Sequence, residues 1–345
     1  MTTRESLYVP VLRARRAEHD ALRQISPNVR KLIAPVIEIT PAFSEKLSAL
    51  PPKRIAQAVW RFALGSGGSR ELYVDLGNLL EHPEADIICH EFEYLVLSLH
   101  ADTQLVFHVS DFSKRGIRRA GELLRKNGAA FRVTSADYLS PALSDFITFM
   151  KRTALTPADI DLLVDCEMVA EGQKLRGTAD RLEKGYNWRS ITYIAGSFPA
   201  SLSAFPKNNE YEVPRIEWQS FSREARSKAN VRYGDYTIQH PLQRDPVPFP
   251  PSASIRYAGE RYWVLMRGEK PGGPNAPGPE QYIGHAFMLR QRSEFCGADF
   301  SAGDAYIDFI AGQDVHTGNP TKWIQAGVNH HVTLAAHQLQ RLRAA

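Results

Sequence analysis

Two acidic residues two positions apart are the strongest candidates for chemistry in this sequence. Asp165 and Glu167 stand at the end of the strand-like segment Ile160–Cys166. Because residues two apart on a strand share a face, these carboxylates are expected to project together. Two carboxylates on one face can bind a divalent metal or share a proton. The pair therefore predicts catalytic and metal-binding roles for both residues.

Other strand-like segments also end in acids. Glu38 and Asp75 close two earlier segments and, with Asp165 and Glu167, make up the predicted metal site. Oxygen ligands suit Mg²⁺ or Mn²⁺, so one of these ions is the predicted cofactor, and no other cofactor is expected. The same acids have a structural alternative, in which they cap the following helices or hold loops, and in which Asp165 can instead pair with an arginine such as Arg132 or Arg189.

A histidine and three further polar residues complete the predicted site. His108 ends another strand-like segment and is the predicted general base. Arg132, Arg215 and Asp235 are the predicted substrate-binding residues, since a guanidinium can hold an anion. Together these groups would suffice for metal-assisted hydrolysis of a phosphoester.

Short motifs of common enzyme classes are absent from the sequence. It contains no H-E-x-x-H, G-x-S-x-G, phosphate-binding Walker or dinucleotide-binding pattern. Four histidines of the C-terminal region lack a cysteine or carboxylate at zinc-site spacing, which favours polar loop and interface roles for His316, His330, His331 and His337.

Eight segments rich in Val, Ile, Tyr and Phe alternate with stretches of helical length. The eight segments are Tyr8–Leu12, Leu32–Ile39, Glu71–Leu76, Gln104–Val109, Ala130–Thr134, Ile160–Cys166, Ser190–Ala195 and Val231–Gln239. The spacers with helical periodicity include Arg54–Leu64, Ile87–His100, Arg115–Lys126 and Ala142–Thr153. This alternation predicts β-α units and a parallel sheet.

A closed barrel is favoured over a doubly wound sheet. The first strand-like segment is followed by Arg13-Ala14-Arg15, without the glycine-rich phosphate loop of dinucleotide-binding folds. We therefore predict an α/β protein with a (β/α)8 TIM-barrel-like fold and a C-terminal α+β appendage. In such barrels the active site lies at the C-terminal ends of the strands, where the acids are expected.

The chain is predicted to divide near a proline-rich segment. Residues 1–244 form the barrel, residues 245–252 a Pro-rich linker, and residues 253–345 an appendage packed on the barrel. Within the appendage, Ala253–Tyr257 and Arg261–Met266 read as a β-hairpin, and a helix is expected from Glu280 to about Arg292.

Composition indicates an ordinary soluble protein. Charged residues make up 23% of the chain and the net charge is +4, a mild excess that helps approach to phosphates without requiring it. No apolar run reaches the length of a membrane span, and the three cysteines have no C-x-x-C spacing. We expect a cytoplasmic location and no membrane partner, and the sequence predicts no oligomeric state.

Several short segments resemble one family from end to end. The opening Tyr8–Leu12 and Ile33–Ile39, then Gly234-Asp235-Tyr236, Trp263–Gly268, Phe300–Asp304 and Asn329-His330-His331, are similar in order and spacing to the beta-protein family of bacteria and phages. The resemblance implies a bacterial or phage origin and a neighbourhood of antiviral defence genes, and it implies no reaction.

Two functions therefore remain open. In the first, the acidic mouth of the barrel binds a metal and hydrolyses a phosphoester of nucleic acid or nucleotides in phage–host conflict. In the second, the protein is not an enzyme: the barrel is a scaffold of a phage-defence system, and the appendage recognises a partner protein or nucleic acid.

Overall fold

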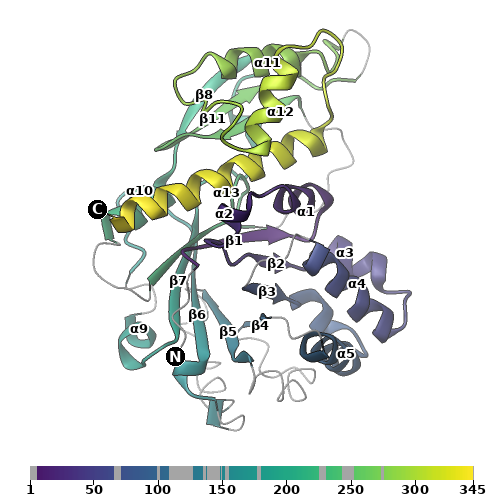
Figure 1. Ribbon diagram of the computed structural model, residues 1–345, viewed down its shortest axis with the longest axis vertical. Coiled ribbons are helices and arrows are strands. Elements are labelled where there is room, and N and C mark those ends of the chain that lie inside the picture. The colour runs from purple at the N-terminus through teal and green to yellow at the C-terminus, as the bar shows by residue number, and fades with distance from the viewer. Residues whose placement is uncertain are drawn as a thin grey trace.

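The computed structural model describes residues 6–65, 71–98, 102–108, 127–134, 137, 148, 150–151, 155–176, 180–224, 231–242, 252–272 and 276–344. Eight parallel strands close into a barrel in the order β1-β2-β3-β4-β5-β6-β7-β9 (Figure 1). They are β1 (Tyr8–Arg13), β2 (Val36–Glu38), β3 (Leu72–Asp75), β4 (Thr103–His108), β5 (Ala129–Thr134), β6 (Ile160–Met168), β7 (Ser190–Gly196) and β9 (Val231–Asp235). Each coincides with one predicted segment, so the predicted TIM-barrel-like fold is confirmed.

In most of the connections that the structure describes, helices lie between successive barrel strands, as β-α units require. On the barrel they are α1 (Arg16–Arg23), α2 (Pro27–Arg30), α3 (Pro41–Leu47), α4 (Pro52–Gly65), α5 (Ala85–Ser98), α9 (Asp180–Gly185) and α10 (Ile216–Glu224), with short 3₁₀ turns η1 (Gly77–Glu81), η4 (Pro157–Asp159) and η5 (Leu202–Ala204). The spacers predicted at Arg54–Leu64 and Ile87–His100 form α4 and α5. The segment Arg115–Lys126 and most of Ala142–Thr153 lie outside the described residues.

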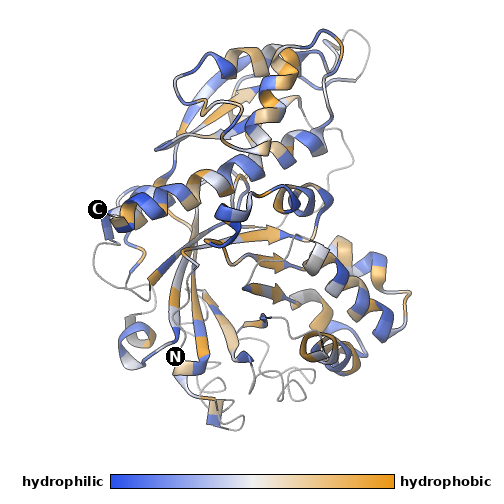
Figure 2. Ribbon diagram, in the orientation of Figure 1, coloured by the Kyte–Doolittle hydropathy of each residue, from blue (hydrophilic) through white to orange (hydrophobic). Residues whose placement is uncertain are grey.

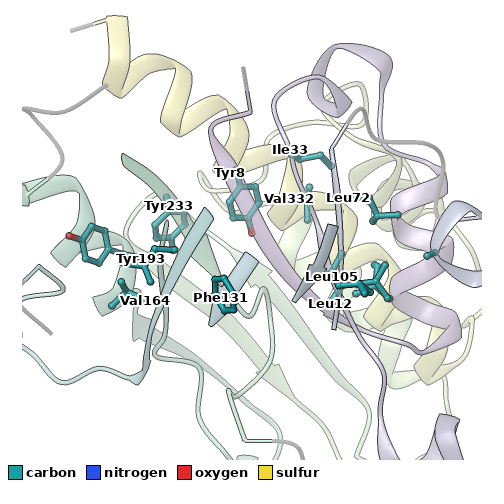
Figure 3. Close-up of a cluster of buried hydrophobic side chains, with 14 of the residues drawn as sticks. Tyr8, Leu12, Ile33, Leu72, Leu105, Phe131, Val164, Tyr193, Tyr233 and Val332 are labelled. Atoms are coloured by element: carbon teal, nitrogen blue, oxygen red, sulfur yellow. The ribbon is translucent and has the colours of Figure 1, made fainter. Parts of the chain in front are cut away.

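Two apolar cores hold the barrel together. Small and branched side chains, such as Val36, Val106 and Leu163, fill its middle. A larger core covers the outer face of the strands under the helices. Figure 3 shows Val332, from the C-terminal helix, in this outer core with Tyr8 and Ile33. The C-terminal helix is therefore packed against the barrel through this shared core.

Polar side chains close the barrel interior at the N-terminal ends of its strands. The Arg232 guanidinium donates to the hydroxyls of Tyr73, at 2.6 Å, and Ser190, at 2.9 Å. Tyr73 and Ser190 in turn donate to Asp161. Burial acts to lower the pKa of Arg232, but Tyr73, Asp161 and Glu71 outweigh it and raise that pKa. The interior is thus a filled core with a buried cation at this end.

The appendage is a three-stranded antiparallel sheet with two helices on it. The strands, in the order β10-β11-β8, are β10 (Ser254–Ala258), β11 (Tyr262–Arg267) and β8 (Asn209–Pro214), and the helices are α11 (Gln281–Arg290) and α12 (Ala302–Ala311). The hairpin and the helix predicted near residues 253–292 are confirmed. Strand β8 comes from the connection between barrel strands β7 and β9, before the predicted boundary, yet it pairs with β11 along its whole length.

The last helix, α13 (Pro320–Ala344), lies between the barrel and the appendage (Figure 1). Hydrophilic and hydrophobic residues alternate irregularly along it (Figure 2). It comes so close to β10 that a Cβ on Gly327 would lie 2.7 Å from the carbonyl oxygen of Arg256. Across the described residues, no helix combines the length and the apolar character needed to cross a membrane.

Candidate functional site

The C-terminal mouth of the barrel is organised around one buried arginine, Arg132, at the end of β5. Its Nε donates to Oδ2 of Asp165 at 2.8 Å. One terminal nitrogen donates to Glu38 Oε1 at 2.6 Å and to Asp75 Oδ2 at 3.2 Å. The other donates to the Tyr236 hydroxyl at 2.6 Å. One guanidinium thus contacts side chains from β2, β3 and β6 and the residue that follows β9.

Charge compensation explains why these acids can be buried. Burial alone would lower the pKa of Arg132, but Tyr236 and the three carboxylates outweigh it and raise that pKa. Arg13, at the end of β1, adds a second cation, with its Nε 4.0 Å from Glu38 Oε2. Burying an ion pair in this way requires good geometry on every partner. Arg132 is therefore a permanent cation placed between the predicted metal ligands.

His108 and Asp75 form a hydrogen-bonded pair at the mouth. Nε2 of His108 lies 2.8 Å from Oδ2 of Asp75, and Oδ1 of Asp75 accepts from the Gly77 backbone N–H at 3.0 Å. The His108 side chain is 26% exposed, whereas that of Asp75 is 5% exposed. Burial acts to raise the pKa of Asp75, but His108 and Arg132 outweigh it and hold that pKa well below its usual range. An ionised carboxylate thus orients the more exposed imidazole.

Glu167 lies at the rim, not in the buried cluster. The pairing of β6 with β7 shifts register between Asp165 and Met168, and Glu167 has a φ of 52°. The alternation behind the predicted Asp165–Glu167 pair does not continue through this bulge: Asp165 is buried and Glu167 is exposed. The two remain linked, because Asp165 Oδ1 accepts the Glu167 backbone N–H at 2.9 Å. Partial burial, with the charge of Asp165, raises the pKa of Glu167.

Asp235 does not join the mouth. Its neighbour Tyr236 points into the barrel, so Asp235 faces outward, beneath α13. It accepts from the hydroxyls of Tyr8, at 2.5 Å, and Tyr233, at 2.9 Å, and it lies 2.8 Å from His331 Nε2. Burial acts to raise the pKa of Asp235, but His331 and these hydrogen bonds lower it to about 2. Asp235 therefore joins the barrel to the last helix.

Arg215 is also buried at this seam, away from the mouth. Its guanidinium donates to the Gly259 carbonyl at 2.9 Å and to Gln338 at 3.1 Å, and it lies over the ring of Trp263. The side chain of Glu217 is 3.5 Å away. The structure thus brings Arg132 to the predicted acids, while it places Arg215 and Asp235, the other predicted substrate-binding residues, between the barrel and the appendage.

Tyr236 and Arg13 belong to the mouth and were not among the predicted site residues. Tyr236 donates to Asp165 Oδ2 at 2.5 Å, and Arg13 donates to Gln239 at 2.6 Å. Strand alternation could have found Tyr236, because Arg232 and Gly234 precede it at the inward-facing positions of β9. Arg13 lies close to Arg15 and Arg16 in the sequence, and no pattern there indicates which buried residues it contacts.

Among curated proteins, none matches the chain. Within the described residues, no group of three or more His, Cys, Asp or Glu side chains is arranged to hold a metal ion. The profile of the Beta protein family matches residues 8–337, which span the barrel, the appendage and most of α13. The chain is therefore a member of the Beta protein family.

Proposed function

We propose that the barrel mouth is the active site of a hydrolase that cleaves phosphoesters, with His108 as its general base. The observation that carries this proposal is the 2.8 Å contact between His108 and the buried carboxylate of Asp75. A carboxylate behind an imidazole fixes its tautomer and orientation and stabilises the imidazolium that forms when it accepts a proton. The pair stands where barrel enzymes carry their catalytic groups.

A divalent metal, Mg²⁺ or Mn²⁺, is the cofactor of this proposal. Such an ion would activate a water and neutralise the phosphoryl group. It would compete with Arg132 for Glu38, Asp75 and Asp165, whose oxygens accept from the guanidinium. Glu167, exposed at the rim, is the predicted ligand that Arg132 does not contact directly. A metal would therefore bind at the rim, or would require Arg132 to move.

The sequence after His108 supports an anionic substrate. Residues 114–126 contain Lys114, Arg115, Arg118, Arg119, Arg125 and Lys126. Basic side chains raise the local concentration of phosphate-bearing molecules. Nucleic acid or nucleotides are the proposed substrates, and phage–host conflict is the proposed setting.

The test is hydrolysis of bis(p-nitrophenyl) phosphate and of a labelled single-stranded oligonucleotide, with Mn²⁺ or with EDTA. His108→Gln should lower the rate by on the order of 100-fold, as loss of a general base does. His90→Gln, on the exposed face of α5, is the matched control and should keep the wild-type rate. Equal rates for wild type and His108→Gln, or no hydrolysis of either substrate, would overturn the proposal.

A non-catalytic scaffold is the second candidate, and one observation favours it. Arg132 contacts its acids at one end of the barrel much as Arg232 contacts Tyr73 and Glu71 at the other. Buried arginine networks can serve structure alone. In this function the appendage would recognise a protein or nucleic-acid partner of a defence system. Loss of stability on Asp165→Asn, without hydrolysis by the wild type, would support it.

A further inference from the structure

A small cavity lies at the seam between barrel and appendage, outside the mouth. Its volume is about 70 Å³, several times the space that one water molecule needs. Side chains of the barrel connections, of β10 and its approach, of α11 and of α13 line it. Among them are Leu202, Ile238, Ser252, Ser254, Arg256, Tyr282 and Trp323. The cavity can therefore hold a group of the size of a phosphate or a carboxylate.

Arg256 is a cation in this cavity without an acidic partner among the described residues. Its guanidinium donates to the Ile238 carbonyl at 3.0 Å and lies 4.9 Å from the centre of the Phe198 ring. Burial lowers the pKa of Arg256 to about 10; Tyr282 acts in the opposite direction, and the charge of Arg13 acts in the same direction as burial. This contrasts with Arg132, whose buried charge is balanced by carboxylates. Arg256 is half-buried, and a partly desolvated cation without an acidic counter-charge is costly, so a bound anion would reduce that cost.

Hydroxyl groups stand beside this cation. The Oγ atoms of Ser252 and Ser254 are 2.9 Å apart, and both residues line the cavity with Arg256. The rings of Tyr282 and Trp323 stack with their centres 5.0 Å apart and form a firm wall. A guanidinium flanked by hydroxyl donors matches the acceptor pattern of an oxyanion.

We propose that this cavity binds an oxyanion, the phosphate or carboxylate group of a small molecule, through Arg256, Ser252 and Ser254. The site is separate from the mouth and does not depend on the hydrolase proposal. The two are close in the chain: Tyr236 contacts Arg132, and Ile238 contacts Arg256. An anion on Arg256 therefore binds beside the segment that carries a mouth residue.

The test is stabilisation of the full chain by inorganic phosphate and by acetate, each titrated at constant ionic strength and read as the melting temperature. The wild-type melting temperature should rise with anion concentration, and above the dissociation constant it should keep rising with the logarithm of that concentration. Arg256→Gln should bind the anion at least tenfold more weakly, so at least tenfold more anion is needed for the same rise in melting temperature. This is the loss of affinity expected when a charge-assisted hydrogen bond is removed. Arg261→Gln removes an exposed cation from the same hairpin and should respond like wild type.

A second variant keeps the proposal testable if Arg256→Gln does not fold. The double variant Ser252→Ala/Ser254→Ala leaves the guanidinium in place. Its affinity for the anion, read from the melting temperature, should be several-fold weaker than that of wild type. A response to phosphate alone assigns a phosphoryl ligand, and a response to acetate alone assigns a carboxylate ligand. Stabilisation of wild type by neither anion, or an equal response from Arg256→Gln, overturns the proposal.

Discussion

The Nε atom of Arg132 lies 2.8 Å from Oδ2 of Asp165, and the two residues come from the adjacent strands β5 and β6. This contact places a protein cation where a metal would otherwise balance the acids. The Tyr236 hydroxyl donates to the same carboxylate oxygen. The acidity of the mouth is therefore already neutralised in large part by the protein itself.

Replacing Asp165 with Asn tests that relationship. The amide cannot balance Arg132, so we expect a loss of about 3 kcal/mol in the free energy of unfolding. Urea denaturation measures the loss, and calorimetry with Mn²⁺ reads metal binding in parallel. Glu167→Gln, at the exposed rim, should change stability by less than about 0.5 kcal/mol. Unchanged stability of Asp165→Asn together with lost Mn²⁺ binding would instead assign Asp165 to a metal.

Replacing Arg132 with Met should turn the mouth into a metal site. Glu38, Asp75 and Asp165 would then lack their shared cation, and we expect a loss of about 3–5 kcal/mol at neutral pH. Divalent ions or protons can replace the cation, so millimolar Mn²⁺, or a shift from pH 8 to pH 5, should restore part of the melting temperature. A variant whose melting temperature responds to neither change would contradict this account of the acids.

The raised pKa of Glu217 predicts that stability falls as pH rises from about 4.5 to about 7. Burial raises its pKa to about 7, although Arg215 and Ser197 act in the opposite direction. A carboxyl whose folded pKa lies above its unfolded value stabilises fully below the unfolded pKa, and that contribution is lost as pH rises through about 7. Glu217→Gln should therefore be more stable than wild type at pH 8 by on the order of 2 kcal/mol, and not at pH 4. Urea denaturation at the two pH values measures this, and a constant difference would contradict it.

His331 joins α13 to the barrel through Asp235. Burial lowers the pKa of His331, although Asp235 opposes this shift. Replacing His331 with Ala leaves Asp235 without one of its hydrogen-bond partners and opens a cavity beside Trp263, so we expect a loss of about 3 kcal/mol in chemical denaturation. His337→Ala, nearer the surface of the same helix, should cost less than about 1 kcal/mol. Equal losses for both variants would contradict a special role for the buried histidine.

The barrel could be predicted because each of its strands is a short apolar run between helical spacers. The meeting of Glu38, Asp75 and Asp165 also followed, since parallel strands place their C-terminal ends at one edge. Pairing of Asp165 with Arg132 was one of the alternatives open from the sequence, but the contacts of the same guanidinium with Glu38 and Asp75 were not predicted, because an inward-facing arginine also fits anion binding. The bulge that moves Glu167 to the rim depends on the pairing of β6 with β7, which no local pattern encodes.

The appendage was harder to predict for a different reason. Asn329, His330 and His331 are buried in α13 between the barrel and the appendage, so this helix lacks the single apolar face that reveals a helix on a surface. Polar loop or interface roles were expected for His330 and His331; both are instead fully buried in α13, where the helix lies between the barrel and the appendage. Strand β8 alternates Glu210 and Glu212 with Tyr211 and Val213, but it is short, none of its side chains is fully buried, and its partner β11 lies about fifty residues further along the chain.

The origin of β8 between β7 and β9 has a consequence for biosynthesis. During translation this strand leaves the ribosome about fifty residues before its partner β11, since they pair from Asn209–Arg267 to Pro214–Tyr262. Until β11 has been synthesised, β8 has no strand to pair with, and an unpaired strand edge can form hydrogen bonds with another chain. The charges of Glu210 and Glu212 on β8 disfavour such pairing until β11 is available.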